Sequence, residues 1–442
     1  MSWLLPVALA VLASSCFADR VLVLTENLGI RDTHSIYLGS IKDRGHQVLV
    51  RTADDASLAL FKHGELIYEH LIILAPGVQA FGGSLSPKEI SKFVDAGGNV
   101  LVAGSSKIGE AIRDLAVENG FEFDESNTAV IDHFNFDSSL DTGDHTTIVV
   151  GKDQLINAQL IVGDTTKIRP VLFKGVALIK DPSNHLALDI VTAASTSYSH
   201  VPGQIAENVA VAGKKTLLVA GLQARNNARI VFTGSVDMFS DAYFNAFATS
   251  ANPARTAERG VATGNAALVS AITQWVLKEN GVLRVKNVEH HRVGESQPPP
   301  REYTIMEDVE YAIEIEELKN GKWVPFLGKD VQLEFVRIDP FVRTTLQNKN
   351  GRLSSQFKIP DVYGVYKFSV DYRRVGYTHL LDVRQMSVRP LWHTQYERFI
   401  RSAYPYYASS FSMMAGVVLF SIAFLYHKDS AKVSVEAAKK KH

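Results

Sequence analysis

The feature that most constrains this chain is an uncharged stretch near its C-terminus. No acidic or basic side chain occurs between Pro405 and Tyr426, and from Ala408 onward the residues are almost all apolar or small. At about 1.5 Å of rise per residue, a helix over 406–426 spans the roughly 30 Å hydrocarbon core of a bilayer. Tyrosines flank both ends, where aromatic side chains favour the membrane–water boundary. We therefore predict one transmembrane helix over 406–426, preceded by a juxtamembrane segment over 391–405.

The N-terminus has the pattern of a signal peptide over residues 1–18. Its apolar run is too short to span a bilayer, and the small residues Cys16 and Ala18 precede Asp19 as a cleavage site requires. We predict Asp19 as the first mature residue. Because Cys16 is the single cysteine of the chain, the mature protein would lack thiols, which excludes cysteine nucleophiles, zinc–thiolate sites and thiol redox chemistry.

The charge on either side of the predicted membrane helix indicates its orientation. A cleaved signal places the region after it in the lumen. The tail over 427–442 carries five lysines against two acidic residues, as cytoplasmic flanks usually do. We predict a single-pass protein with a lumenal N-terminus. The net charge of the whole chain is −1, so no domain is basic enough to suggest nucleic acid as a partner.

The region over 19–150 alternates short apolar strands with helical segments. Continuous apolar strands between helices are typical of a parallel sheet covered on both faces. This predicts an α/β domain, doubly wound and flavodoxin-like in plan. The region over 151–285 mixes strands with a helix over 265–279, and we interpret it either as a continuation of the α/β unit or as a second α/β or mixed region docked on the first. The expected strands are at residues 21–24, 47–50, 71–74, 99–102, 146–150, 176–180, 216–220 and 229–233.

The pattern changes after a proline-rich connector predicted over 286–301. From 302 to 390 apolar and polar residues alternate as in half-buried strands, and Asn320-Gly321 and Asn350-Gly351 have the composition of hairpin turns. The segment from Asp361 to Phe368 is similar to the tyrosine corner of immunoglobulin-like sandwiches. We predict an all-β, sandwich-like domain over 302–390.

Two glycine-bearing turns are candidates for a ligand site, since α/β sheets bind ligands at the carboxyl ends of their strands. Gly104-Ser-Ser-Lys-Ile-Gly109 is neither a dinucleotide fingerprint nor a phosphate-binding loop nor a nucleophile elbow. A structural strand-to-helix turn capped by Ser105 or Ser106 is the simpler interpretation. The loop from Gly77 to Gly83 is similar, with a flexible connection and a binding loop both open.

Histidines and aspartates form the second group of candidates. None of them has a metal-ligand spacing on an evident helix, so satisfied or exposed side chains are the simpler interpretation. Metal binding by the acidic stretches remains an alternative. The residues concerned are His133, His145, His185 and His200 with the nearby Asp132, Asp144 and Asp189, together with Asp54-Asp55 and the acidic stretch from Asp137 to Asp144.

Small residues recur every fourth position in the predicted membrane helix. Ala408, Ser412 and Gly416 share one face, which lets a second helix approach closely. Helix packing is therefore predicted on this face, with chance spacing as the alternative. A membrane helix without charge is not suited to carry ions or protons.

The whole chain resembles the family of the 48 kDa subunit of the oligosaccharyltransferase complex. The resemblance is carried by segments along its full length. They are Val21-Leu-Val-Leu-Thr-Glu-Asn-Leu28, Leu71-Ile-Ile-Leu-Ala-Pro76, Asp95-Ala-Gly-Gly-Asn-Val100, Val231-Phe-Thr-Gly-Ser235, Pro340-Phe341, the segment from Pro360 to Phe368, and Arg389-Pro-Leu-Trp-His393.

This resemblance implies a non-catalytic, assembly and stabilising subunit in the endoplasmic reticulum membrane. The complex transfers oligosaccharide from dolichyl diphosphate to Asn of Asn-X-Ser/Thr during N-glycosylation. The implied partners are the catalytic subunit, the ribophorins and the defender against cell death subunit. Lys439 and Lys440, fourth and third from the C-terminus, fit a dilysine retrieval signal, with a solvated basic tail as the alternative.

Two other functions stay open. The α/β region could bind and present lipid-linked glycan or acceptor, or the chain could be a lumenal amidotransferase-like hydrolase, against which the missing cysteine and elbow count. We predict no catalytic, cofactor-binding or metal-binding residue and no cofactor.

Overall fold

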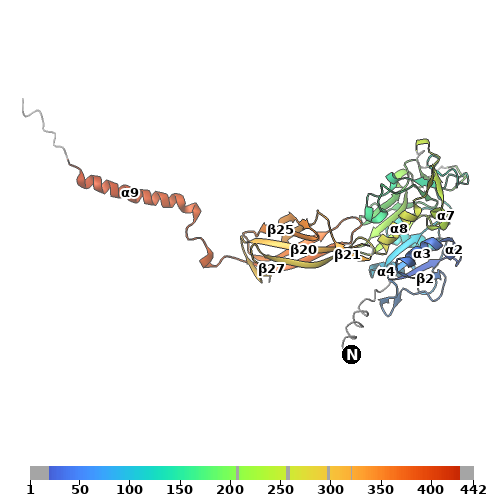
Figure 1. The fold of residues 1–442 in the computed structure, drawn as a ribbon, viewed down its shortest axis with the longest axis horizontal. Helices are drawn as coiled ribbons and strands as arrows, with labels where there is room; N and C mark the ends of the chain where they lie inside the picture. The colour runs from blue at the N-terminus through green and yellow to red at the C-terminus, as the bar shows by residue number, and fades with distance from the viewer. Residues whose placement is uncertain (1–18, 206–208, 255–258, 296–298, 320, 429–442) are drawn as a thin grey trace, which may run out of the picture.

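The computed structural model describes residues 19–205, 209–254, 259–295, 299–319 and 321–428. The predicted signal peptide and the predicted retrieval lysines, Lys439 and Lys440, lie outside the described residues. Figure 1 shows an α/β domain at one end, an elongated β-rich domain beside it and a separate helix, α9, at the other end.

The first domain is built on a nine-stranded mixed sheet. Its strands run in the order β2-β1-β5-β6-β15-β14-β11-β7, and β12 also pairs with β14. The first five are parallel to one another, whereas β14 is antiparallel to β15, β11 and β12. The bounds are β1 Arg20–Thr25, β2 Gln47–Thr52, β5 His70–Leu74, β6 Asn99–Ala103, β7 Phe121–Phe123, β11 Leu178–Lys180, β12 Ala187–Thr192, β14 Leu217–Gln223 and β15 Arg229–Thr233.

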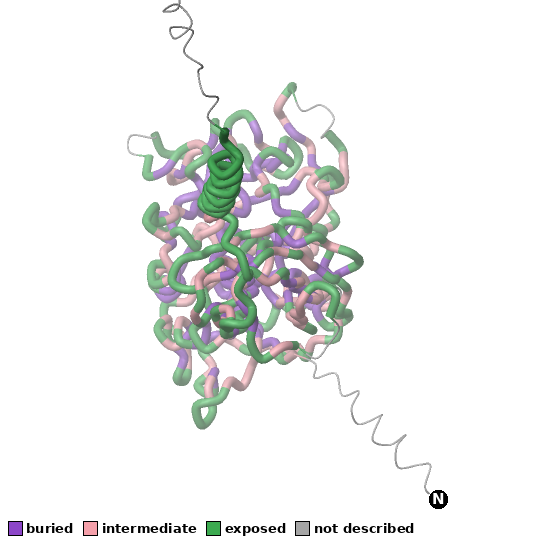
Figure 2. Tube along the Cα trace, turned by 90° about the vertical axis from the view of Figure 1, so that its left-hand side faces the viewer, coloured by how far each residue is buried: buried purple, intermediate pink, exposed green. Residues whose placement is uncertain are grey.

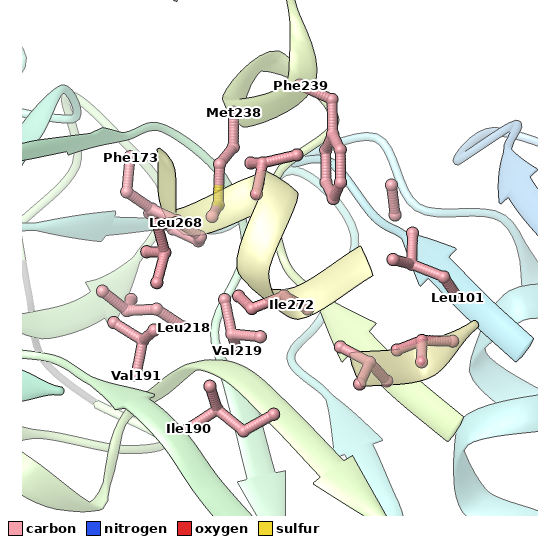
Figure 3. Packing of buried hydrophobic residues seen from close by; sticks show 14 of the residues in the cluster. Leu101, Phe173, Ile190, Val191, Leu218, Val219, Met238, Phe239, Leu268 and Ile272 are labelled. Carbon is pink, nitrogen blue, oxygen red and sulfur yellow. The ribbon is translucent and has the colours of Figure 1, made fainter. Parts of the chain in front are cut away.

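Helices cover both faces of this sheet because alternate strand residues point to opposite sides. Val21 and Val23 of β1 join the cluster that includes helices α3 (Ser35–Asp43) and α8 (Asn265–Val276). Leu22 and Leu24 join the cluster of α4 (Pro87–Asp95) and α5 (Glu110–Glu118) on the other face. Figure 3 shows the first cluster, where Leu268 and Ile272 of α8 lie over the sheet residues Leu218 and Val219.

The parallel sheet predicted over 19–150 is present in β1, β2, β5 and β6, but the complete sheet is mixed because antiparallel strands extend it. Residues after 150 supply β11, β12, β14 and β15 to the same sheet, and β15 lies directly beside β6. A strand that is buried on both faces has the same apolar pattern whether its neighbour is parallel or antiparallel, so the direction was not visible in the sequence.

Shorter elements complete the domain: α2 Ile30–Thr33, β3 Phe61–Lys62, β4 Glu65–Leu66, β8 Ala129–Ile131, β9 Ile148–Val150, α6 Gln159–Val162, β10 Val171–Phe173, β13 Tyr198–His200, α7 Asp241–Phe244, β16 Phe247–Thr249 and β17 Arg259–Ala262.

The β-rich domain consists of two five-stranded sheets around one core. One sheet has the order β18-β20-β25-β24 with β21 paired to β20, and the other β19-β27-β26-β22-β23. Fully buried aromatic side chains fill the space between them, including Tyr311, Phe335 and Phe368. The bounds are β18 Val282–Arg292, β19 Glu302–Thr304, β20 Asp308–Lys319, β21 Lys322–Pro325, β22 Gln332–Val336, β23 Pro340–Thr345, β24 Gln347–Lys349, β25 Arg352–Lys358, β26 Gly364–Tyr372 and β27 Leu380–Arg389.

Two predicted turn features of this domain are present. Asn350 and Gly351, with φ of 53° and 90°, connect β24 to β25 as a two-residue hairpin loop requires. The hydroxyl of the buried Tyr366 donates to the carbonyl oxygen of Val362 at 2.7 Å, which is the hydrogen bond of a tyrosine corner. Asn320 lies outside the described residues.

The predicted connector over 286–301 is partly wrong. Residues 286–292 belong to β18, which pairs along almost its whole length with β20. The sequence did not reveal this strand because its residues alternate little: most are exposed or half-buried. The chain therefore enters the β-rich domain at Val282, directly after the α/β domain.

The predicted membrane helix is α9, Tyr404–Tyr426. Including the short turn before it, residues 401–426 form a helix long and apolar enough to cross a membrane, and none of it is buried against the rest of the chain. Figure 2 shows it exposed along its length. Its length and composition make it a candidate membrane span.

Candidate functional site

The first candidate, the turn 104–109 at the crest of the sheet, is held by the chain itself. The Gly104 N–H donates to the Thr233 carbonyl oxygen, and the Gly109 N–H donates to that of Pro76, both at 2.7 Å. The Lys107 N–H donates to Ser105 Oγ at 3.2 Å. The serine thus caps its own turn, as the simpler interpretation expected.

The second candidate, the loop 77–83, covers the N-terminus of α5. A Cβ atom on Gly109 would overlap the carbonyl group of Val78, so the two turns touch backbone to backbone. The amide of Glu110 faces Gln79 Oε1 at 3.4 Å, and Glu26 accepts a hydrogen bond from the Gly77 N–H. The two predicted candidates meet, and the N–H groups of Gly104, Lys107, Gly109 and Glu110 already have protein acceptors, so they are not free to bind a phosphate.

The crest also lacks the parts of a nucleophilic site. Among the described residues, no histidine or carboxylate forms a hydrogen bond with Ser105 or Ser106, although a serine nucleophile needs such a base. The arrangement supplies rigid support for the strand ends and no acid–base pair.

The structure brings His133 and His145 together and leaves His185 and His200 apart from them. The rings of His133 and His145 are 5.0 Å apart, but His133 Nε2 is 2.9 Å from the Tyr198 hydroxyl and His145 packs on Phe136. His200 Nδ1 faces a backbone carbonyl oxygen 3.0 Å away, and His185 is exposed on the edge of a cleft described below. These contacts agree with satisfied or exposed side chains.

The aspartates nearby are anchors for their own loops. Asp132, fully buried, accepts from the N–H groups of Phe134 and Asn135 and from the hydroxyl of Ser197. Burial alone would raise the pKa of Asp132, but these hydrogen bonds lower it overall. Asp141 accepts from four backbone amides between 143 and 147, and its pKa is lowered in the same way.

Three other acidic candidates, Asp55, Asp137 and Asp189, have similar partners or an opposite charge beside them. Asp55 Oδ1 accepts from both the N–H and the hydroxyl of Ser57 at 2.8 Å, which lowers its pKa. Asp137 accepts from Ser139 and from the Thr249 N–H, and Asp189 pairs with Lys180 at 2.6 Å. A carboxylate saturated by its own loop is a poor starting point for a metal site.

Sequence reasoning missed a cluster in which Asp19, His46 and His70 bring one ligand atom each within 4.8 Å of one another. Nε2 of the buried His70 is 3.5 Å from Asp19 Oδ2, and His46 Nε2 is 2.9 Å from Glu279 Oε1. The three residues are far apart in sequence and follow no spacing motif, so no local signal could have found them.

Hydrogen bonding argues against a metal in this cluster. Asn99 Oδ1 accepts from the Arg229 N–H, so its Nδ2 donates to His70 Nδ1 at 3.1 Å. His70 Nδ1 is then an acceptor, and the neutral ring carries its proton on Nε2, facing Asp19. A metal-bound histidine normally has the opposite arrangement, with its second nitrogen donating.

The junction between the two domains is the other feature that the sequence did not reveal. Arg229 is fully buried at the start of β15. Its guanidinium donates to the carbonyl oxygens of Trp275 (2.6 Å) and Asn280 (3.0 Å). It also donates to those of Gly281 (3.2 Å) and Gly376 (3.1 Å), and Gly376 belongs to the β26–β27 loop of the β-rich domain. One side chain thus connects both domains, and burial lowers its pKa to about 9.

Further hydrogen bonds join the same loop to the α/β domain. The Trp275 indole N–H donates to Gly376 O at 2.9 Å, and Gln223 Nε2 donates to Tyr377 O at 2.8 Å. Beside these contacts lies an open cleft of about 470 Å³. Its lining residues include His185, Leu186, Arg225, Arg374, Val375 and Tyr377.

The predicted packing residues of α9 are all exposed. Gly416 has open space where a Cβ would be, and the Ser412 hydroxyl donates to the Ser409 carbonyl oxygen of its own helix at 2.9 Å. Ala408 lies four residues earlier, on the same face. This face is available to another helix.

Comparisons with known proteins cover most of the chain. The family description "OST48, N-terminal domain" matches residues 12–279, and "OST48 middle domain" matches residues 290–428. Three curated relatives carry the name dolichyl-diphosphooligosaccharide–protein glycosyltransferase 48 kDa subunit. The relative from Caenorhabditis elegans is 67% identical over 96% of both chains, and that from Danio rerio is 56% identical over 93% of both. The relative from Drosophila melanogaster is 52% identical over 93% of this chain and 92% of its own.

A solved structure of a thua-like protein from Parabacteroides merdae aligns with 59% of this chain and 90% of that one. Its sequence identity of 13% and TM-score of 0.30 are too low for a conclusion about the fold. The family matches and the near-complete coverage of the curated relatives are sufficient without it. This chain belongs to the OST48 family, whose curated members are named as 48 kDa subunits of the dolichyl-diphosphooligosaccharide–protein glycosyltransferase.

Proposed function

We propose that this chain is a non-catalytic, assembly and stabilising subunit of the oligosaccharyltransferase complex, which transfers oligosaccharide from dolichyl diphosphate to Asn of Asn-X-Ser/Thr. The observation that carries the proposal is the closed crest. At the place where an α/β sheet offers a ligand site, the turns 104–109 and 77–83 meet backbone to backbone at Gly109 and Val78. The N–H groups of Gly104, Lys107 and Gly109 already have acceptors within the chain. The strand order β2-β1-β5-β6-β15 supports a flavodoxin-like plan for the parallel half of the sheet.

The test of the non-catalytic role is the triple substitution Ser105→Ala, Ser106→Ala, Lys107→Ala. Transfer of glycan to an Asn-X-Thr peptide is measured per assembled complex, so that lost assembly is not mistaken for lost chemistry. We expect the wild-type rate, because these residues only shape a turn. Loss of a catalytic donor or nucleophile typically reduces rate by about 100-fold or more, and a drop of that size with the complex intact would refute the proposal. Such a drop would also favour the two alternative functions, presentation of glycan and hydrolysis. The closed crest argues against both.

The partners that we propose are the catalytic subunit, the ribophorins and the defender against cell death subunit. The surface for them in the membrane is the face of Ala408, Ser412 and Gly416 on α9, where small side chains permit close helix contact. Contacts between membrane helices contribute about 1–2 kcal/mol each at most, so one substitution should weaken assembly only in part. The Ser412→Leu, Gly416→Leu double variant should co-purify less of the complex while still inserting. The control is Val418→Leu, because position 418 already carries a large side chain. Unchanged co-purification of the double variant would place the contact on another face.

We further propose a location in the endoplasmic reticulum membrane as a single-pass protein with a lumenal N-terminus. The lysine-rich tail and the helix α9 support this orientation. Protease added to sealed microsomes should remove only the tail beyond 427 and leave the rest intact. N-terminal sequencing of the protected fragment should begin at Asp19. A fragment that begins at Met1, or digestion of the large domains without detergent, would contradict the proposed orientation or processing.

A further inference from the structure

The end of the β-rich domain next to α9 carries apolar side chains on two adjacent loops. Ile338 is 83% exposed between β22 and β23, and Tyr363 is 63% exposed just before β26. Phe341 and Val365 follow on the strands that these loops begin, and both are also exposed. Large apolar groups gathered at loop tips, away from any core, indicate an interaction surface.

Strand registers place these loops at the end where the chain leaves for α9. Gly364 of β26 pairs with Val388 of β27, one residue before β27 ends at Arg389. Val336 pairs both with Lys367 of β26 and with Pro340 of β23, so the turn through Ile338 lies at the same end. Figure 1 shows the α/β domain at the opposite end of the β-rich domain.

The two loops are held in fixed positions. Arg337 donates from Nη1 to the Tyr363 carbonyl oxygen at 3.0 Å and lies over the ring of Phe341, 6.0 Å from its centroid. The Tyr366 hydroxyl donates to the Val362 carbonyl oxygen, and the Tyr366 ring contacts the Phe341 ring edge-on, with 5.7 Å between the ring centroids. The apolar tips are therefore presented by a rigid support, so little conformational entropy is lost when they bind.

The segment between the β-rich domain and α9 limits what can cover this surface. β27 ends at Arg389 and α9 begins at Tyr404, so 14 residues separate them. Even fully extended, such a segment reaches only about 50 Å. Two exposed side chains of this segment, Trp392 and Tyr396, are of the kinds that favour the membrane boundary. Phe399 and Ile400 are exposed apolar side chains in the same segment.

We propose that the loops 337–341 and 361–365 insert their apolar side chains into the lumenal leaflet of the membrane that α9 crosses. The inference rests on the proposed membrane span. The charges at these loops are of both signs, with Arg337 and Lys367 near Asp339 and Asp361. The lipid class is therefore any fluid bilayer with neutral headgroups, because insertion depends on apolar contact and not on anionic lipid. Docked in this way, the β-rich domain cannot tumble on its tether, and it sets the height of the α/β domain above the bilayer.

Site-specific fluorescence in the full chain tests this docking, and the chain suits it because Cys16 is its single cysteine. Ile338→Cys is labelled with an environment-sensitive dye and reconstituted in phosphatidylcholine nanodiscs with or without spin-labelled lipid. The matched control is Leu327→Cys, a leucine 68% exposed at the other end of the same domain. There the neighbouring Phe326 packs on Tyr377 of the domain junction. Val418→Cys in α9 reports the membrane span itself.

We expect the label at 338 to shift to shorter wavelength and to be quenched several-fold more by shallow spin-labelled lipid than the label at 327. The label at 418 should respond to deep spin-labelled lipid. Equal responses at 338 and 327, with 418 quenched, would overturn the docking and leave the span intact. A label at 418 without quenching would overturn the span and the docking with it. Iodide quenching in solution gives a third outcome. If the label at 338 is protected from iodide only in the assembled complex, and spin-labelled lipid does not quench it, the loops contact a protein partner and the proposal is overturned.

Discussion

The side chain of Arg229 connects the two domains, and its removal tests how strongly they are coupled. Arg229→Met keeps an apolar stem of similar length against Trp275, whose ring lies 4.9 Å from the guanidinium carbon. It removes all four hydrogen bonds to carbonyl oxygens, including the one to Gly376 in the β-rich domain. The variant should loosen the junction while both cores remain packed.

The magnitude follows from two opposing effects. A hydrogen bond from a charged donor contributes about 1.5–3 kcal/mol, so four contribute on the order of 6–12 kcal/mol. Burial of the cation opposes them: the fall of the Arg229 pKa from 12.5 to about 9 corresponds to about 5 kcal/mol. After substitution the carbonyl of Trp275 still accepts from the Lys278 N–H, and those of Gly281 and Gly376 still accept from Thr378 N–H and Trp275 Nε1. The two effects together leave a net loss of about 1–7 kcal/mol when the guanidinium is removed. Because three of the four carbonyl oxygens keep another donor, we expect a loss of about 2–4 kcal/mol.

The assay is thermal unfolding of the full chain in detergent, combined with limited proteolysis. A loss of this size should lower the midpoint by several degrees. The connection at 277–282 should become the first site of cleavage, because the two domains then open independently. Arg225→Met is the matched control, an exposed arginine on the same side of the junction that should change stability by less than about 0.5 kcal/mol. If Arg229→Met unfolds at the wild-type midpoint and resists protease equally, the guanidinium does not couple the domains and the reasoning fails.

Three further outcomes are expected. Gly109→Ala should destabilise the chain by about 1–3 kcal/mol in urea unfolding, because the new methyl group meets the Val78 carbonyl, whereas Gly39→Ala in α3 has open space and should be neutral or stabilising; equal midpoints would show that the crest is not closed. Burial lowers the pKa of His70, so protons bind the unfolded state more strongly and stability should fall as pH drops below the ordinary histidine pKa of 6.5; His70→Gln should reduce the difference in urea midpoint between pH 7.5 and pH 5.5, and an unchanged difference would assign the effect to other groups. Lys439→Ser with Lys440→Ser should let chains expressed without partners leave the endoplasmic reticulum, measured by Golgi processing of a glycan reporter fused to the lumenal end; full retention would show that the tail is only a solvated basic segment.

Several features were predictable from the sequence because short segments determine them. The apolar stretch of α9, the buried strands β1, β5 and β6 and the turn at Asn350 depend on side chains within about one element length. The tyrosine corner was visible for the same reason, since Tyr366 bonds to a residue four positions earlier. The family resemblance was also readable, because it follows from the order of residues alone.

The tertiary structure decided what distant residues do together. Strand β15 lies beside β6 although about 130 residues separate them, and a doubly buried strand carries no mark of its neighbour's direction. The closed crest, the Asp19–His70 pair and the four carbonyl oxygens around Arg229 depend on loops that meet only after the sheet has formed. Local preference acts over a few residues, whereas these contacts are selected by packing and by the need to satisfy buried polar groups across the whole fold.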